Sequence, residues 1–518
     1  MQRLKLGHPV LFALLPILNT LTRNPGGSRP TDIIVVVGVV LIGAALGYLL
    51  IAGVLRRRAP QGITALLVLI SVFLFYGKSA LGGFTRQTAG LPPALLLGVL
   101  LMIFGLAVWW LVRRPHLLDR VNTFLALTSV VMVGWLTARL VANHFRSRAI
   151  VHNSALATEL ARPVNSRAPA GPQDQPAPDI YVLALDEYAH AAVLRNLFQF
   201  DNRMFEDSLR QLGFTIPRLV RSNYVHTVLS LPSLLNFSHL TRLTQEVGAR
   251  STDASLPNYL LEHNRTASYL KRRGYRFLFY PSQWWPSTIE NGNADWEYDA
   301  WPGFNPVREI SRSDLRRSLI RTTALDYLIR DDAWDADFIR RTLSALEDVP
   351  EYDGPTFAFA HILSPHWPYV FKADCGVAAE TQVSGRTGRQ RAYTDQLQCL
   401  NRLLLHTVST ILQRSSVPPV ILLQGDHGTN LLRYSDAPSA TAVTPAQASE
   451  RLGAFGAYYA PGGGRSLFAD TVTVVNVLQK VLNYYAGAEL QPSPDDLYVS
   501  LERTPYDFAP VNPAELLY

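Results

Sequence analysis

Charged side chains are scarce in this chain of 518 residues. Asp, Glu, Lys and Arg make up 17% of it, whereas hydrophobic residues make up 48%. The charged share is low for a wholly soluble protein, which argues against that class. The apolar excess is concentrated before about residue 142, so the averages describe two unlike parts of the chain.

The chain also lacks the basic clusters interleaved with aromatics that a nucleic-acid-binding surface requires. Its formal net charge is +7, but the basic residues stand at the ends of apolar segments, as in Arg56–Arg58 and Arg113–Arg114. This arrangement is typical of the cytoplasmic loops of membrane proteins. We therefore expect no nucleic-acid partner.

Cysteine is nearly absent, and the only two are Cys375 and Cys399. They are even in number and close in sequence, which favours one disulfide if this part of the chain is exported to an oxidising compartment. Two unrelated buried thiols are the alternative.

Five apolar segments occupy the N-terminal part. A transmembrane helix needs about 20 mostly apolar residues. The segments are Pro9–Leu21, which is short and interrupted by Pro16, then Ile33–Leu55, Ile63–Gly77 with its extension SALGGF, Leu91–Val112 and Val121–Ala138. They predict an α-helical membrane domain of five transmembrane helices.

The distribution of basic residues predicts the orientation of these helices. With the N-terminus inside, the cytoplasmic segments carry eight Lys and Arg residues and the first two outer loops carry four. This bias favours the N-inside topology. Five crossings then place everything after residue 142 outside the cytoplasm.

A proline-rich segment follows the membrane part. Arg162–Asp179 contains five prolines and reads as an extended spacer. We predict a transmembrane domain over residues 1–145, a linker over 146–178 and an extracytoplasmic domain over 179–518.

The pattern from Asp179 onward is that of an α/β domain. Apolar, β-rich runs cover residues 180–186, 276–281, 356–362, 419–426 and 453–461, and helical segments cover Pro257–Arg273, Trp334–Glu347 and Arg391–Gln413. Continuously apolar strands are typical of a sheet covered by helices on both faces. The alternation predicts an α/β/α fold around a mostly parallel central sheet.

Acidic and imidazole side chains end two of these predicted strands. Asp186 follows VLAL, and Asp426 and His427 follow VILLQG. In open α/β sheets, sites form outside the carboxyl ends of the strands, so this layout suits a metal site. A lone Asp after a strand usually caps a turn, and it is the pairing with DHG that favours the metal.

Thr227 opens the helical stretch TVLSLPSLLN. A hydroxyl there could bind a metal, lose its proton and attack phosphorus, while backbone N–H groups steady the anion. Taken alone, the segment favours the simpler interpretation, in which Thr227 is an N-cap.

Four motifs in order resemble the alkaline phosphatase superfamily, over roughly residues 179–465. TVLSLPSLLN is similar to the nucleophile segment of the phosphoethanolamine transferases that modify lipid A, whose relatives include the lipoteichoic acid synthases and the sulfatases. LALDEYA, HILSPHWPYVF and LLQGDHG resemble the metal-binding and His-rich elements. The resemblance implies a membrane-anchored, sulfatase-like catalytic domain.

The resemblance implies a role for each site residue. Asp186, Thr227, Asp426 and His427 would ligate a divalent metal, for which zinc is favoured and manganese or magnesium are alternatives. Thr227 would also be the catalytic nucleophile. His361 and His366 would bind phosphoryl oxygens or protonate the leaving group, with a core or surface imidazole as the alternative for each.

The chain departs from its relatives in three places. Sulfatases need Cys or Ser as nucleophile with Arg four residues later, where this chain has Thr227 and Leu231, so hydrolysis of ordinary sulfate esters is disfavoured. The phosphoethanolamine transferases carry a further His after DHG, whereas no histidine follows His427 here. Glu187 stands where many relatives have Gly.

The resulting expectation is a multi-pass protein of the bacterial inner membrane with a periplasmic catalytic domain. It would move a phosphoethanolamine- or phosphoglycerol-type head group from a membrane phospholipid, through Thr227, to an envelope glycan or lipid. Alternatives are a phosphodiesterase, a phosphatase or a sulfatase-like hydrolase at the same site, or a non-catalytic envelope binding protein. The Trp-rich segment 284–304 could line a cleft, touch the membrane or pack beneath a loop.

The predicted topology can be tested with reporter fusions. An alkaline phosphatase fused after residue 150 is expected to be active, because the preceding five crossings export it. A reporter that works only in the cytoplasm should be silent at the same position. The reverse pattern would overturn both the topology and the argument for a disulfide.

Overall fold

A computed structural model describes residues 7–23, 30–55, 61–76, 93–167, 176–282, 288, 290–300, 332–378, 383, 385–468 and 470–518. The described residues divide into two compact units, the first ending at Ala149 and the second beginning at Ile150.

The first unit is helical throughout its described part. Its helices are α2 (His8–Arg23), α3 (Pro30–Leu55), α4 (Gln61–Tyr76), α6 (Pro93–Val112) and the long α7 (Pro115–His152). Two described helices have the length and apolar composition needed to cross a bilayer, over Ile33–Gly53 and His116–His152, and shorter apolar helices cover His8–Thr22, Ile63–Phe73 and Met102–Leu111. Five membrane crossings therefore stay a prediction.

Large apolar side chains are exposed along these helices. Ile34 and Leu50 in α3 and Trp135 in α7 each expose about 70% of their surface. In water this exposure would forfeit the hydrophobic free energy of each side chain, whereas in lipid it would forfeit none. The exposed faces therefore suit a bilayer.

A six-stranded sheet forms the centre of the second unit, in the order β4-β3-β5-β1-β6-β8. All neighbouring pairs are parallel except β6 with β8. The strands are β1 (Ile180–Leu185), β3 (Arg276–Tyr280), β4 (Trp296–Glu297), β5 (Thr356–Ile362), β6 (Val420–Gly425) and β8 (Gly456–Tyr459). This confirms the predicted α/β domain with a mostly parallel sheet.

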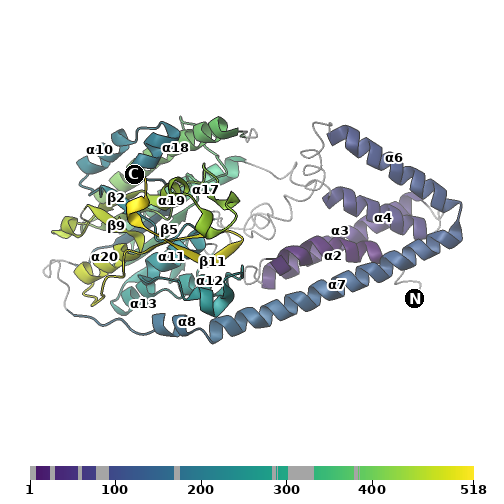
Figure 1. Ribbon diagram of the computed structural model, residues 1–518, viewed down its shortest axis with the longest axis horizontal. Helices are drawn as coiled ribbons and strands as arrows, with labels where there is room; N and C mark the ends of the chain where they lie inside the picture. Colours follow the sequence, from purple (N-terminus) through teal and green to yellow (C-terminus); the bar gives the residue numbers. More distant parts are fainter. Residues whose placement is uncertain are drawn as a thin grey trace. The chain divides into compact units, whose positions relative to one another are not determined.

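Helices cover both faces of this sheet, because alternate residues of β1 enter different cores. Tyr181, Leu183 and Leu185 pack against one set of helices, and Ile180, Val182 and Ala184 against the other. The first set is α9 (Ala191–Phe198), α10 (Arg203–Gln211), α17 (Asp332–Leu346) and α18 (Gly385–Arg414), and the second is α11 (Thr227–Asn236), α13 (Arg265–Arg272) and α20 (Val477–Tyr485) (Figure 1).

Smaller elements complete the second unit. They include a three-stranded sheet, β7-β2-β9, and the hairpin β10-β11. The remaining elements are α8 (Ala155–Leu160), α12 (Ser255–Glu262), α19 (Pro445–Leu452), β2 (Leu219–Arg221), β7 (Gly453–Ala454), β9 (Thr471–Thr473), β10 (Leu497–Leu501), β11 (Thr504–Val511) and seven short helical turns, η1 (Thr244–Gly248), η2 (Val349–Glu351), η3 (Tyr434–Asp436), η4 (Ala440–Ala442), η5 (Gly464–Leu467), η6 (Val474–Asn476) and η7 (Pro513–Glu515).

Two sequence predictions differ from the observed elements. The helix predicted over Pro257–Arg273 is two helices, α12 and α13, because the Asn264 side chain accepts a hydrogen bond from Ala267 N and starts a new helix. The strand predicted over 453–461 is split into β7 and β8 at Phe455. In the Trp-rich segment, Trp296 packs against Tyr280, and Trp284, Trp285 and Trp301 lie outside the described residues.

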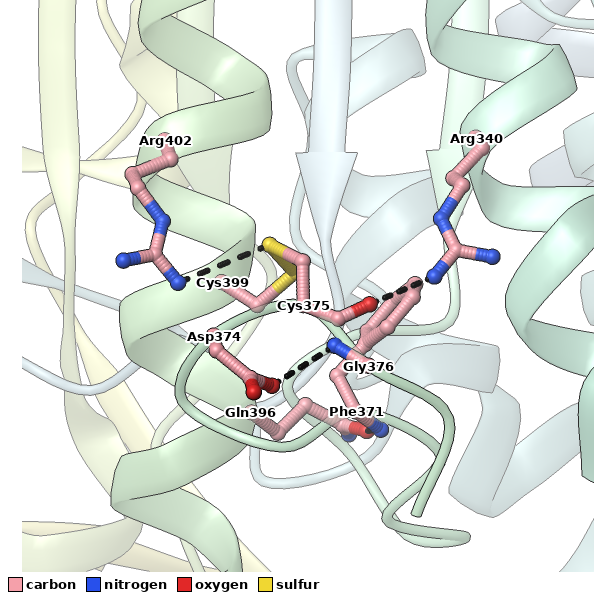
Figure 2. The surroundings of a disulfide bond; sticks show 8 residues. All are labelled: Arg340, Phe371, Asp374, Cys375, Gly376, Gln396, Cys399 and Arg402. Atoms are coloured by element: carbon pink, nitrogen blue, oxygen red, sulfur yellow. Dashed lines mark hydrogen bonds between the residues drawn. A yellow bond between two sulfur atoms is a disulfide. The ribbon is translucent and has the colours of Figure 1, made fainter.

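The predicted disulfide is present between Cys375 and Cys399, with their Cα atoms 4.9 Å apart. It attaches the loop after β5 to the buried face of α18 (Figure 2). On the loop side, Arg340 of α17 donates a hydrogen bond to Cys375 O at 2.6 Å. The loop is therefore held from two helices.

Removing this bond is expected to destabilise the second unit. The cross-link spans 24 residues, and a closed loop of that length lowers the entropy of the unfolded chain by about 3 kcal/mol at room temperature. The double variant Cys375→Ser/Cys399→Ser should lose about that much free energy of unfolding in a denaturant titration. The reduced wild-type protein should match it. Equal stability of the variant and the oxidised protein would refute the expectation.

Candidate metal centre and nucleophile

The site begins at the carboxyl end of β1, the central strand. Asp186 follows β1 directly, and its backbone N–H donates to Ile362 O of β5 at 3.0 Å. The residue is only 1% exposed. Neither carboxylate oxygen of Asp186 has a hydrogen-bond partner among the residues described here. A buried carboxylate in that state needs a cation nearby.

The neighbouring strand β6 delivers the second carboxylate. Asp426 Oδ1 accepts hydrogen bonds from the backbone N–H groups of Glu187 at 3.1 Å and His427 at 2.8 Å. Those two bonds orient the side chain. They leave Oδ2 buried with no hydrogen-bond partner in the described part of the chain, and it lies 3.2 Å from His427 Nε2.

The other neighbour of β1 supplies an imidazole. His361 lies within β5, in register with Ala184 of β1. Its Nδ1 contacts Thr288 Oγ1 at 2.8 Å and Ser282 Oγ at 3.1 Å, and its Nε2 lies 3.6 Å from Asp186 Oδ2. A metal-ligating histidine usually has its second ring nitrogen held by a hydrogen bond, and here two hydroxyls hold Nδ1 while Nε2 faces the carboxylates.

These side chains fit a divalent cation. One ligand atom from each of Asp186, His361 and Asp426 lies within 4.8 Å of the others. Ligand atoms around a tetrahedral zinc ion stand roughly 3.4 Å apart, given metal bonds of about 2.1 Å. The geometry favours His361 as a ligand, whereas the sequence grouped it with the residues that contact the phosphoryl group.

The electrostatics of the two carboxyls point the same way. Burial and then the charge of Asp186 raise the pKa of Asp426 well above its usual value. Burial alone would also raise the pKa of Asp186, but the imidazoles of His366, His361 and His427 outweigh it and hold that pKa low. A cation between the two carboxylates would lower the pKa of Asp426 and favour the ionised form of both.

Thr227 is the first residue of α11 and stands beside this cluster. Its Oγ1 lies 3.0 Å from His427 Nε2. The preceding residue, His226, is the N-cap and makes no side-chain capping bond. Ser230 Oγ instead donates to His226 O at 3.0 Å, and Ser233 Oγ donates to Ser238 O at 2.8 Å. Of the three hydroxyls, only that of Thr227 faces the cluster.

The ring of His427 has a defined orientation. Its Nδ1 lies 3.1 Å from Gly428 O, so this nitrogen carries the proton and Nε2 presents its lone pair. Burial and then Arg451 lower the pKa of His427 well below its usual value. The imidazole is therefore neutral, as a metal ligand must be.

Two further charged residues lie at the site, of which the sequence singled out Glu187 but not Arg451. Arg451, in α19, is buried and donates through Nη1 to Glu187 Oε1 at 2.5 Å. Glu187 follows Asp186 and has a φ of 60°, in the left-handed region that favours glycine. In the sequence, Arg451 looks like an ordinary residue on the polar face of a short helix, 24 residues after His427. The replacement of a usual Gly by Glu187 was the only available clue.

A cavity of about 1110 Å³ adjoins the cluster. Glu187 and His366 line it at the cluster, and its other walls come from the loop after β5, the start of α18 and the segment after His427. Burial lowers the pKa of His366, but Asp186 and then Glu187 outweigh that effect, so the pKa lies above its usual value. His366 thus stands between the cluster and the cavity.

One protein family matches this chain. Residues 198–462 match the family model of the sulfatases. No curated protein matches the chain.

Several solved structures are similar to part of this chain. The C-terminal periplasmic domain of EptC from Escherichia coli in complex with Zn is 10% identical, with a TM-score of 0.45, covering 69% of this chain and 98% of that domain. The C-terminal periplasmic domain of the phosphoethanolamine transferase EptC from Campylobacter jejuni is 13% identical, with a TM-score of 0.37 and coverages of 60% and 90%. For the soluble domain of lipooligosaccharide phosphoethanolamine transferase A from Neisseria meningitidis, identity is 14%, the TM-score 0.38 and the coverages 63% and 95%.

Substitutions at the cluster should reduce metal binding. Asp426→Asn and His361→Gln are each expected to weaken zinc binding by more than about 100-fold, because loss of a ligand exceeds the 10- to 100-fold effect of losing a supporting group. Zinc affinity would be measured by competition with a chelating dye on the purified full chain.

The exposed Asp436, which pairs with Arg433, provides the control, and Asp436→Asn should bind zinc normally. If only His361→Gln keeps the zinc affinity of the wild type, His361 is not a ligand, and its role would be the one predicted from the sequence, contact with the phosphoryl group or the leaving group. Unchanged affinity in Asp426→Asn would refute the metal centre.

Proposed function

The chain belongs to the sulfatase family, and on this basis we propose that it is a metal-dependent phosphotransferase that moves a phospholipid head group, through Thr227, to an acceptor of the cell envelope. Membership makes it a sulfatase-like hydrolase or transferase. The proposal adds the nucleophile, the class of donor and the class of acceptor.

One observation carries the proposal. A threonine hydroxyl at a helix N-terminus lies 3.0 Å from the unprotonated nitrogen of a neutral histidine, beside two buried carboxylates. That constellation has the parts of an activated nucleophile. Threonine also lacks the chemistry of the Cys or Ser that sulfatases convert to formylglycine, which favours phosphoryl over sulfuryl transfer.

Each residue of the site has a role in the first displacement. A divalent cation bound by Asp186, Asp426, His361 and His427 would lower the pKa of the Thr227 hydroxyl and screen the negative charge of the substrate. The Thr227 hydroxyl first loses its proton to solvent. Its oxygen Oγ1 then attacks phosphorus, and the bond from phosphorus to the lipid oxygen breaks, with the bonding electrons leaving on that oxygen. Backbone N–H groups in the first turn of α11 face the phosphoryl oxygens. His366, at the cavity wall, gives a proton to the departing lipid oxygen.

A second displacement completes the transfer. The hydroxyl of the acceptor attacks the phosphorus on Thr227, its proton passes to His366, and the Thr227 oxygen leaves. The cavity of about 1110 Å³ supports a glycan or lipid acceptor, because drug-sized ligands occupy roughly 300–1,000 Å³ and water needs far less. Hydrolysis at the same site is the alternative that uses water.

The N-terminal helices support a lipid donor. Two described helices are long and apolar enough to cross a bilayer. We place residues 1–145 in the bacterial inner membrane, the linker at 146–178 and the catalytic domain, 179–518, on the periplasmic side. A phospholipid head group would then be within reach of an anchored enzyme.

The nucleophile can be tested by substitution and trapping. Thr227→Ala should abolish transfer and leave folding intact, because the side chain is short and lies beside the cluster. In the zinc-loaded full chain incubated with membrane phospholipid, intact-mass analysis should reveal a head-group phosphate adduct on the peptide that contains Thr227.

Ser230→Ala and Ser233→Ala are the matched controls. Each removes a hydroxyl from the same helix that bonds only a backbone carbonyl, so both should stay active. An active Thr227→Ala with a dead serine variant would move the nucleophile. Activity in all three variants would remove the covalent step.

A further inference from the structure

The Arg451–Glu187 pair is the charged feature at the site for which the proposed reaction has no use. Both residues are buried, at 6% and 9% exposure. Two contacts anchor the guanidinium to backbone: Nε donates to Val225 O at 2.8 Å and Nη1 donates to Gly428 O at 2.7 Å. Nη1 also pairs with Glu187 Oε1. These bonds fix where the third nitrogen points.

That nitrogen, Nη2, reaches the reactive groups. It lies 3.3 Å from His427 Nε2, the same atom that Thr227 Oγ1 contacts at 3.0 Å. An imidazole nitrogen has one lone pair, so it cannot serve the Arg451 N–H, a hydroxyl proton and a metal together. Once the lone pair is used for catalysis, the buried Arg451 N–H requires another acceptor.

Glu187 is held in place at a conformational cost. A non-glycine residue with a φ of 60° is destabilised, and a glycine would adopt this backbone without strain. The carboxylate that glycine would lack is the one that pairs with Arg451. A buried ion pair contributes little to stability on balance, so stability alone is a weak reason to keep it.

The charges of the site can be counted. Asp186 and Asp426 would balance a divalent cation, and Glu187 balances Arg451, so a protonated His366 would carry the one positive charge left over. Glu187 also lines the cavity. A ligand with two negative charges is repelled by Glu187 about twice as strongly as a ligand with one.

We propose that Arg451 and Glu187 form an oxyanion subsite, in which Arg451 Nη2 binds an unesterified oxygen of the phosphoryl group and Glu187 positions the guanidinium and favours singly charged phosphodiesters over doubly charged monoesters. The inference rests on the proposed function, since it assigns part of the substrate to that same site. Arg451 acts as a catalytic residue in this scheme, and Glu187 is a positioning and specificity residue.

The test compares two variants that differ only at position 451. Arg451→Gln alone would leave Glu187 buried without its partner and could unfold the domain. Neither Glu187→Gln nor Glu187→Gln/Arg451→Gln leaves a buried carboxylate without its partner. In Glu187→Gln the guanidinium keeps its hydrogen bonds to Val225 O and Gly428 O, and the double variant removes both charges. Inorganic phosphate at pH 8 and dimethyl phosphate serve as doubly and singly charged probes, with binding measured by calorimetry on the zinc-loaded full chain.

Glu187→Gln should bind phosphate roughly tenfold more tightly than the wild type, because a repelling carboxylate is gone and Arg451 is free for the anion. The gain for dimethyl phosphate should be smaller. The double variant should bind both probes at least roughly tenfold more weakly than Glu187→Gln. Zinc content should equal that of the wild type throughout.

Arg503→Gln is the matched control, because Arg503 also donates to backbone carbonyls, those of Ser435, Ala437 and Pro438, and should leave phosphate binding unchanged. Equal phosphate binding by Glu187→Gln and the double variant overturns the subsite. Weaker phosphate binding by Glu187→Gln than by the wild type also overturns the subsite, because removing either partner of a purely structural ion pair would weaken binding. In both cases the proposed function would still be supported by a head-group phosphate adduct on Thr227. A wild-type protein that binds neither zinc nor phosphate would refute both the subsite and the proposed function.

Discussion

The carboxylates of Asp186 and Asp426 are buried at the ends of adjacent strands, where their negative charges repel each other. The rest of the site is arranged around this repulsion. Burial raises the pKa of Asp426, and the charge of Asp186 raises it further. The fold brings the carboxylates together because β1 pairs with β6 in parallel, so both strands end at the same edge. A cation bound there would relieve the repulsion, and the imidazoles of His361 and His427 lie next to the two carboxylates. Binding of such a cation would be coupled to the order of this edge.

The positions of Asp186 and Asp426 could be predicted because they depend on local sequence. An apolar run with an acidic residue at its end identifies a buried strand and its carboxyl edge. The observed β1 and β6 end one residue before these aspartates, at Leu185 and Gly425. Thr227 could be placed at a helix start for the same reason, since the cap and the following apolar periodicity are local.

The features that were missed depend on contacts between distant segments. Arg451 is 264 residues from the Glu187 that it pairs with, and nothing in PAQASERL distinguishes it from a surface arginine. For His361, the ligand geometry depends on hydroxyls of Ser282 and Thr288, which come from the segment after β3. The break between α12 and α13 was a local signal that was overlooked, because Asn264 is a strong N-cap within an otherwise helical pattern.

The turn after β1 couples these parts, because its backbone serves both neighbouring strands. Asp186 N donates to Ile362 O on the β5 side, and Glu187 N donates to Asp426 Oδ1 on the β6 side. Glu187 makes that second bond while its backbone is in the left-handed conformation. Its side chain pairs with Arg451. Glycine at 187 would relax the backbone but leave a buried guanidinium without its carboxylate, which is destabilising. The orientation of the Asp426 carboxylate therefore depends on the backbone of residue 187, and the charge beside Thr227 depends on the side chain of the same residue.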